Sequence, residues 1–345
     1  MVDELEEALS KGDYKKSLML VMGKKNVLHQ ISNLRKVAER FGRLEPVEIM
    51  IKLSEKLPLV DRIKAYCIIG RTAGALGLEK EADKYFQRAR ESIEGVPSTT
   101  IQGELLSYLA WSMGKDRRYK DAFETFREAY EVLLRTWGFS HSIIGSMIEL
   151  GQRIGEIADE VPNELALEYY LLASKVFSII GFNLQAQDFS NRAELVMETL
   201  KRGSNKILEL FDQGDVELAL SMTRFLKPQQ KVVSLLRMFL WAVVHEQENI
   251  ANRTFEEALN LLGVGKFKPP QETIIRFAYG ALRLGRGREA LILAGFIEND
   301  TIAAEIVGKV LLKIGNPDVL EVIVENVKNE DLRNRIKELI KEIKS

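Results

Sequence analysis

The sequence predicts an all-α protein built from antiparallel helix hairpins that stack on one another as repeats. Signals for β-strands are nearly absent, because no alternating run of β-branched residues is bounded by Asn-Gly or Asp-Gly hairpin turns. Apolar residues instead recur at helical spacing along the chain. One ten-residue pattern also occurs twice, as KEADKYFQRA at 80–89 and as KDAFETFREA at 120–129. A motif that returns at a fixed distance is typical of a repeat protein.

Three regions are expected along the chain. Residues 1–60 are predicted to form N-terminal helical hairpins that begin with a short acidic helix over 3–10. Residues 61–202 hold the core repeats. Residues 203–345 are expected to form degenerate C-terminal helical repeats, and an amphipathic helix over 329–344 is expected to cap the open end of the array.

The best-defined hairpin is predicted over residues 63–93. In its first helix Tyr66, Ile69 and Ala73 fall on one face, at i, i+3 and i+7. Gly77 begins a turn that is too short for anything but a tight reversal of the chain. The two helices must therefore run antiparallel and share an apolar face.

Similar turn signals recur along the chain and separate roughly 14 to 16 predicted helices. Glycine supplies the left-handed residue that ends a helix, and Asp or Asn supplies the N-cap of the next. The turns are predicted at Gly12-Asp13, Gly77, Lys115-Asp116, Pro162-Asn163, Gly214-Asp215, Gly285-Gly287 and Gly315-Pro317.

The repeated motif has a physical explanation. Alanine is expected where two helices come closest, because a larger side chain would separate them. Phenylalanine one turn later fills the space towards the next hairpin. A single hairpin cannot bury its whole apolar surface, so it stacks against another hairpin.

These residues resemble the tetratricopeptide repeat, a helix-turn-helix unit of about 34 residues. The matching residues are Gly70, Ala82, Phe86 and Ala89 in one copy, Ala110, Ala122, Phe126 and Ala129 in a second, and Ala166, Tyr170 and Ala173 in a looser third. Ile154 replaces the small residue of the third copy, and Ala219 and Ala290 keep only the turn and one small position. The proline that usually closes the unit is missing after Ile93 and Leu133. The resemblance implies a right-handed α-α superhelix whose concave groove binds peptides or partner helices.

Composition limits the class of protein. The 345 residues include 49 basic and 50 acidic side chains, and this balance argues against a general nucleic-acid binder. The start MVDELEEALS is acidic rather than basic then apolar, so no signal peptide is expected. The most apolar window, Val232–Val244, is too short and too charged to span a bilayer. We therefore expect a soluble cytoplasmic protein, and its many Lys, Arg and Glu residues would suit a heat-adapted one.

The sequence contains no recognisable catalytic or metal-binding motif. The three histidines are scattered, with no pair at i, i+3 or i+4, and phosphate-binding glycine loops and nucleophile elbows are absent. The lone Cys67 lies in an apolar helical segment, where inert packing is the favoured interpretation over a reactive thiol. We accordingly expect no enzymatic activity, no metal and no cofactor.

The resemblance places a candidate binding groove on the first helices of the two clear repeats. By position, Lys64, Cys67, Arg71 and Gly74 would face it from one unit, and Glu104, Ser107, Trp111, Gly114 and Lys115 from the next. We take Lys64, Arg71, Trp111 and Lys115 as the partner-binding candidates, because Trp and Arg are frequent in interface hot spots. The alternative is that Trp111 only packs against the next hairpin. Arg71 and Trp111 also stand where the family's clamp for C-terminal carboxylates has other residues, so binding of chaperone tails is not expected.

A second candidate surface is the basic segment 264–288. Its residues Arg276, Tyr279, Arg283 and Arg286 follow i, i+3, i+7, i+10 spacing and would share one helix face that could hold anions or RNA. The alternative is a solvated face whose charges are matched by acids from neighbouring hairpins.

The sequence as a whole favours a non-catalytic scaffold that binds a protein or peptide along the concave face. Two other functions stay open: an anion- or RNA-binding repeat protein that uses the basic segment 264–288, and a sensor module that regulates a separate ATPase or transcription factor. Neither a membrane nor a nucleic-acid partner is expected, and the oligomeric state is left open.

Overall fold

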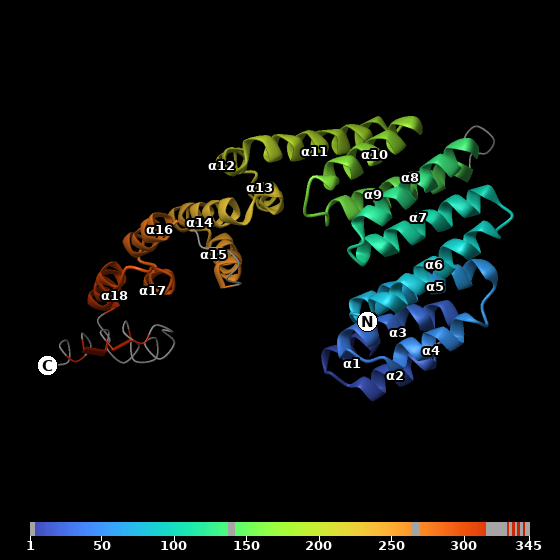
Figure 1. The fold of residues 1–345 in the computed structure, drawn as a ribbon, viewed down its shortest axis with the longest axis horizontal. Helices are drawn as coiled ribbons and strands as arrows, with labels where there is room; N and C mark the ends of the chain where they lie inside the picture. The colour runs from blue at the N-terminus through green and yellow to red at the C-terminus, as the bar shows by residue number, and fades with distance from the viewer. Residues whose placement is uncertain are drawn as a thin grey trace. The chain divides into compact units, whose positions relative to one another are not determined.

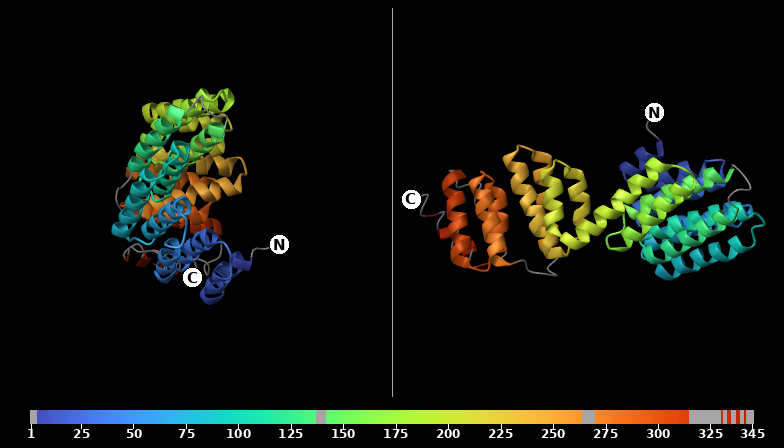
Figure 2. Two further views of the ribbon diagram at one scale, coloured as in Figure 1. Left: turned by 90° about the vertical axis from the view of Figure 1, so that its right-hand side faces the viewer. Right: turned by 90° about the horizontal axis from the view of Figure 1, so that it is seen from above.

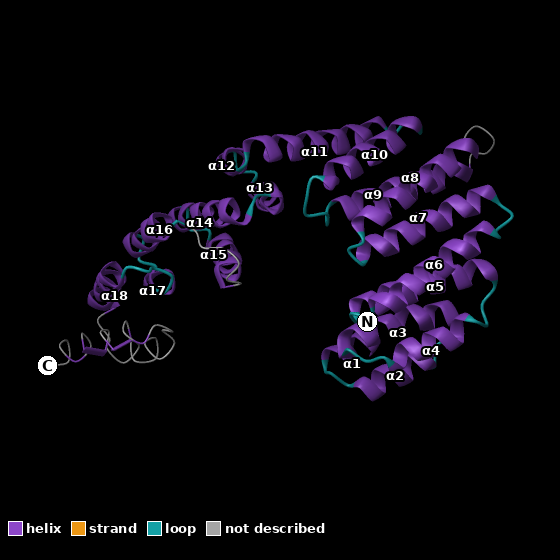
Figure 3. Ribbon diagram, in the orientation of Figure 1, coloured by secondary structure: helices purple, strands orange, loops and turns teal. Residues whose placement is uncertain are grey.

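The computed structural model describes residues 4–136, 142–263 and 270–314, and six single positions beyond residue 329. These described residues form eighteen α-helices and one short 3-10 helix, with no strand among them (Figures 1 and 3). The predicted all-α class is confirmed. The helices outnumber those expected because several are shorter than ten residues, too short for their apolar spacing to stand out. The capping helix expected over 329–344 and the turn at 315–317 lie outside the described residues, apart from those single positions.

Contacts within the chain divide it into two compact units, residues 1–197 and residues 198–345. The first unit keeps the expected N-terminal hairpins of residues 1–60 together with the repeats that follow. Its helices are α1 (Glu4–Ser10), α2 (Tyr14–Met22), α3 (Val27–Phe41), α4 (Glu45–Ser54), α5 (Leu59–Ala75), α6 (Glu79–Glu94), α7 (Thr99–Lys115), α8 (Tyr119–Thr136), α9 (Ser142–Ala158), α10 (Leu165–Ile179) and most of α11 (Asn183–Arg202). Helix α11 continues across the division and ends where the sequence-based boundary at 202/203 was expected.

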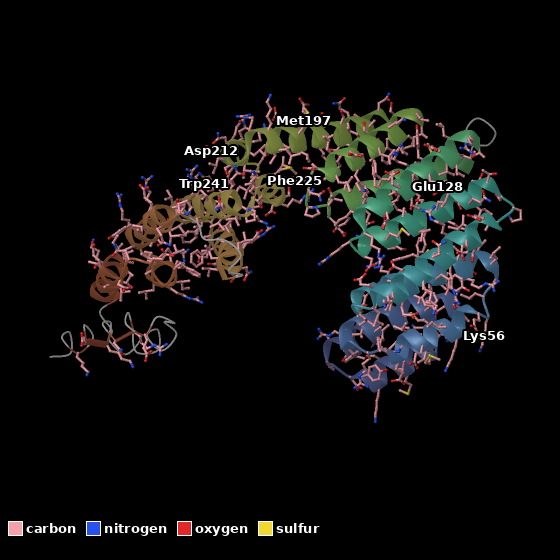
Figure 4. All side chains as sticks on the ribbon, viewed as in Figure 1. Lys56, Glu128, Met197, Asp212, Phe225 and Trp241 are labelled. Carbon is pink, nitrogen blue, oxygen red and sulfur yellow. The ribbon has the colours of Figure 1, made fainter. Side chains whose placement is uncertain are left out.

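The second unit repeats the hairpin arrangement. Its helices are the end of α11, α12 (Ser204–Asp212), α13 (Val216–Met222), the 3-10 helix η1 (Thr223–Phe225), α14 (Pro228–Val244), α15 (Glu248–Gly263), α16 (Gln271–Arg283), α17 (Gly287–Ala294) and α18 (Asp300–Ile314). Helix α14 packs against α15 and α16 against α17, and α14 also contacts α16. Trp241 of α14, labelled in Figure 4, meets Phe211 edge to face, with ring centroids 4.7 Å apart.

Within the first unit the hairpins stack so that like helices are neighbours. Helix α5 pairs with α6, α7 with α8 and α9 with α10, and the first helices α3, α5, α7 and α9 contact one another in that order (Figures 1 and 2). We call the exposed side of these four helices the first-helix face. Lys64, Arg71, Trp111 and Lys115 are partly exposed on it, whereas Cys67, Ser107 and Gly114 of the predicted groove are buried.

The small residues of the repeat motif lie where helices cross, as predicted. Ala82, Ala89, Ala122 and Ala129 are all 0% exposed. The aromatic positions are filled as expected, with Phe86 2% exposed, Phe126 0% and Tyr170 1%. A Cβ added at Gly70 would lie 2.9 Å from ring atoms of Phe86, so this position admits no side chain without movement of the ring. Close helix contact therefore explains why the motif keeps its small residues.

Successive hairpins also share the same hydrogen bond in the turn between their two helices. In the α5–α6 turn the backbone N–H of Leu78 donates to the Ala73 carbonyl at 2.9 Å, across Gly77 with φ 76°. The same bond closes the α7–α8 turn, where Arg118 donates to Met113 at 3.0 Å. This is the Schellman motif, which requires a left-handed residue. Left-handed residues end helices at Gly12, Gly42, Gly77, Arg117, Gly181, Gly214, Glu246 and Gly285.

The first prediction tests the helix crossing at Ala122. Ala122→Leu places a larger side chain where no space exists and should lower the free energy of unfolding by about 1–3 kcal/mol. Chemical denaturation measures the change, and Lys120→Leu at an exposed position of the same helix is the control. If both variants unfold at the wild-type denaturant concentration, Ala122 does not lie at a crossing.

The second prediction concerns the left-handed turns at Arg117 and Glu246, where the residue is not glycine. Arg117 and Glu246 have φ of 63° and 57°, a conformation that costs an L-residue about 1 kcal/mol or more. Arg117→Gly should therefore raise stability by about 0.5–1 kcal/mol despite the greater entropy of glycine in the unfolded chain. Arg127→Gly within α8 is the matched control and should lower stability by a similar amount. A loss of stability in Arg117→Gly would contradict the assigned turn.

Candidate functional site

Two aromatic rings on α7 form the centre of the first-helix face. Helix α7 starts at the N-cap Ser98, and its regular spacing brings Tyr108 and Trp111 side by side at i, i+3. Their ring centroids lie 5.7 Å apart, and both side chains are half-buried. The Arg71 guanidinium of α5 lies 5.2 Å from the Trp111 ring centroid. This is a cation–π distance, so α5 and α7 are joined through the predicted Arg71–Trp111 pair.

Trp111 and Lys115 are also tied to the next hairpin. The indole Nε1 of Trp111 donates a hydrogen bond to Glu156 Oε2 at 2.9 Å. Lys115 Nζ lies 2.5 Å from Glu156 Oε1 and pairs with Glu160 as well. Burial alone would lower the pKa of Lys115, but its bonds to the two carboxylates outweigh burial and the pKa is raised. The two predicted residues are brought together, and the charge of Lys115 is already matched within the protein.

Arg71 differs from Lys115 because no carboxylate lies within ion-pair distance of it in the described part of the chain. Burial and repulsion from the Arg35 guanidinium of α3 lower the pKa of Arg71. Its positive charge is thus partly desolvated and is opposed only by more distant acids. Such a group would gain from an anion placed beside it.

Arg153 on α9 belongs to the same face and was missed by the sequence analysis. Its guanidinium lies 5.4 Å from the Tyr108 ring centroid, and Nη1 donates to Ser107 Oγ at 3.1 Å. Arg153 also pairs with Glu149 on its own helix. Glu149, Arg153, Glu156 and Glu160 follow i, i+4, i+7, i+11 spacing, a signal that the sequence does contain.

Tyr108 also belongs to the first-helix face, and it was not among the residues predicted from the sequence. Burial raises the pKa of Tyr108 to about 12. Three guanidinium groups act against that shift, namely those of Arg153, Arg71 and Arg35. Tyr108 is therefore a neutral hydrogen-bond donor at physiological pH, beside cations from three other helices.

Of the other residues of the predicted groove, Lys64 is partly exposed, whereas Cys67 and the two glycines contribute to packing. Lys64 lies half-buried on α5, two turns before Arg71, and has no ion-pair partner among the described residues. Cys67 is fully buried, and burial raises the pKa of its thiol, which fits the inert packing that was favoured. A Cβ on Gly114 would lie 2.7 Å from Ile157, and one on Gly74 would meet the Asp116 carboxylate. These glycines therefore serve helix packing.

Two of the four described arginines in the segment 264–288 are ion-paired. Arg276 pairs with Glu272 at 2.5 Å on its own helix, and Arg286 Nη1 donates to Glu248 Oε1 at 2.9 Å. Tyr279 interacts with Glu305 of α18, which helps to raise the pKa of Tyr279 beyond the effect of burial. These pairs agree with the alternative of a charge-matched surface.

One part of the sequence-based description of this segment is wrong. Helix α16 ends at Arg283, and Arg286 is the N-cap residue of α17, so the four side chains do not share one helix. A left-handed glycine, Gly285, ends the helical spacing that the prediction had extended through it. Residues 264–269 of the segment lie outside the described residues.

A cleft of about 610 Å³ lies on the other side of the hairpins, between α6 and α8. Phe86 and Met113 are among its lining residues. Two of its arginines are paired, Arg118 with Asp116 at 2.7 Å and Arg90 with Glu128, labelled in Figure 4, at 2.6 Å. This cleft was not predicted from the sequence, because apart from Phe86 its lining residues are not among those that match the repeat.

The described ranges contain neither a candidate membrane span nor a candidate metal site. No helix there is long and apolar enough to cross a membrane. No group of three or more His, Cys, Asp or Glu side chains in those ranges could hold a metal ion.

Comparison with solved structures supports the helical fold. No family model and no curated protein matches the chain. The crystal structure of Ton1535 from Thermococcus onnurineus NA1 is similar to it, with a TM-score of 0.58 and 20% identity over 98% of both chains. This similarity shows a shared fold. A circular tandem repeat protein matches 98% of this chain and 86% of its own at 15% identity, but its TM-score of 0.22 is too low to indicate a shared fold.

The third prediction uses the pKa of Tyr108. An unfolded tyrosine loses its proton near pH 10, whereas Tyr108 should keep its proton to about pH 12. The folded state then binds more protons in this window, so the contribution of Tyr108 to stability is complete below pH 10 and is lost as the pH rises to 12. Phenolate absorbance of the wild type minus that of Tyr108→Phe should show one late-titrating group. A difference signal centred at pH 10 would contradict the assigned environment.

Proposed function

We propose that this chain is a tetratricopeptide-like repeat protein that acts as a non-catalytic cytoplasmic scaffold. Its first-helix face binds an extended acidic peptide, with Trp111 as the anchor. The observation that supports this most is the half-buried Trp111 ring beside Arg71, a cation without an ion-pair partner in the described part of the chain. An exposed aromatic surface next to an unmatched guanidinium is typical of interface hot spots.

The geometry of the stack favours binding by a preformed surface. Trp111 is fixed at both sides, by the Arg71 guanidinium and by its hydrogen bond to Glu156. A ligand would therefore meet an ordered ring, and little conformational entropy would be lost on binding. Lys115 contributes less than the sequence suggested, since two carboxylates already match its charge. Charge recognition would then come from Arg71 and Lys64, which lie two turns apart on α5.

The fourth prediction tests Trp111 as the anchor. Trp111→Ala should weaken binding of the partner peptide by about 2 kcal/mol or more, because a hot-spot aromatic is lost. The partner is first captured from native extract and then reduced to a synthetic peptide for calorimetry. Arg71→Gln should mainly slow association, and the effect should shrink as salt rises.

Two controls separate this proposal from its rivals. Arg276→Glu alters the basic segment in the other unit and should leave peptide affinity unchanged, whereas a loss there would favour the anion- or RNA-binding alternative. Thermal melting of Trp111→Ala distinguishes packing from binding. Wild-type affinity combined with a lower melting temperature would mean that Trp111 only packs against the next hairpin, and the proposal would fail.

A further inference from the structure

Two arginines from neighbouring helices lie against the α7 aromatic pair, and a third acts on it electrostatically. The Arg71 guanidinium lies 5.2 Å from the Trp111 ring, the two rings are 5.7 Å apart, and the Arg153 guanidinium lies 5.4 Å from the Tyr108 ring. Arg35 of α3 acts electrostatically on both Arg71 and Tyr108. The first-helix face thus gathers guanidinium groups from α3, α5 and α9 around one phenol on α7.

Arg71 is matched less closely by acids than the arginines on either side of it. Arg35 is held by Glu39 at 2.8 Å and Arg153 by Glu149, each four residues away on the same helix. Such pairs are weak and exchange readily with solvent. Arg71 has no such partner among the described residues, and the two acids that act on it electrostatically, Glu39 and Glu160, are each paired with another cation. Cations crowded in this way repel one another until an anion enters.

We propose that Arg35, Arg71, Arg153 and Tyr108 form a binding site for a tetrahedral phosphoryl group. The inference rests on the proposed function in one respect, because we take the group to be a phosphorylated side chain of the bound peptide. The Tyr108 hydroxyl keeps its proton and donates a hydrogen bond to one oxygen. The guanidinium groups donate to the others, and Glu39 and Glu149 turn outward to solvent as the anion enters.

The arrangement favours a phosphoryl group over a carboxylate. A carboxylate is planar and is satisfied by one guanidinium in a forked pair. Donors that approach from three helices can be used together only by a group with oxygens in several directions and about two negative charges. Trp111 covers one side of Arg71 and would hold its guanidinium plane in place for the ligand.

The fifth prediction is tested with inorganic phosphate as the probe. Isothermal titration of the full chain should show one site for phosphate, and acetate should bind at least about tenfold more weakly. Arg71→Gln and Arg153→Gln should each weaken phosphate binding about tenfold or more, and Tyr108→Phe about three- to tenfold. Arg71→Lys keeps the positive charge and serves as the control for a folding defect in Arg71→Gln. It should lose less affinity for phosphate than Arg71→Gln does.

Matched controls are arginines already paired elsewhere. Arg90→Gln, on α6 of the same unit, and Arg276→Gln, in the other unit, should bind phosphate as the wild type does. The inference is overturned if phosphate fails to bind at about 10 mM, or if the Arg71 and Arg153 variants stay within about twofold of the wild type. Equal losses in the control variants would indicate nonspecific charge attraction and would overturn it too.

A peptide experiment separates this inference from the proposed function. The partner peptide is titrated with and without a phosphorylated serine, and phosphorylation should strengthen binding to the wild type but not to Arg71→Gln. If Trp111→Ala abolishes peptide binding while phosphorylation has no effect, the phosphoryl site fails and the scaffold function stands. If phosphate binds as expected but Trp111→Ala leaves peptide affinity unchanged, the scaffold proposal fails and the anion site stands.

Discussion

The close approach of α7 to α9 is the constraint on which the first-helix face depends. Gly114 meets Ile157 so closely that even a Cβ would lie 2.7 Å from it. Ala110, one turn earlier on α7, is likewise 0% exposed. Close-packed helices of this kind leave no freedom to slide, because dispersion contacts and buried apolar area are lost together when they separate. The separation of the two helices is therefore set by packing, before any polar contact is considered.

The polar contacts of the face follow from that spacing. Trp111 and Lys115 reach Glu156, and Arg153 reaches Ser107, all across the same helix pair. Partly exposed ion pairs contribute little to stability on their own. These contacts instead fix the positions of the aromatic and guanidinium groups, so that a ligand meets an ordered surface. Helix packing thus positions the residues of the proposed site. The ligand would be recognised by the charged groups that have no close partner in the described part of the chain.

Much of the fold could be predicted from the sequence, because close helix crossings need small residues and these recur visibly. Ala82 and Ala122 lie where the motif placed them. The site was only partly predictable. Trp111 and Arg71 were found through their repeat positions. The partners of Lys115 were not, since Glu156 lies on α9 and Glu160 just after it, where Ile154 obscures the repeat. The helix face that was predicted to include Arg286 is interrupted at Gly285. Helical periodicity alone does not reveal a left-handed turn at that position.

The most direct test measures the coupling between Trp111 and Glu156 when the α7–α9 approach is disturbed. Native-state hydrogen exchange gives the opening free energy of α7 amides for the wild type, Trp111→Phe, Glu156→Ala and the double variant. The coupling should be about 1 kcal/mol. In a Gly114→Ala background, where the new methyl group pushes Ile157 away, it should fall close to zero. An undiminished coupling in Gly114→Ala would contradict the claim that helix packing positions the site.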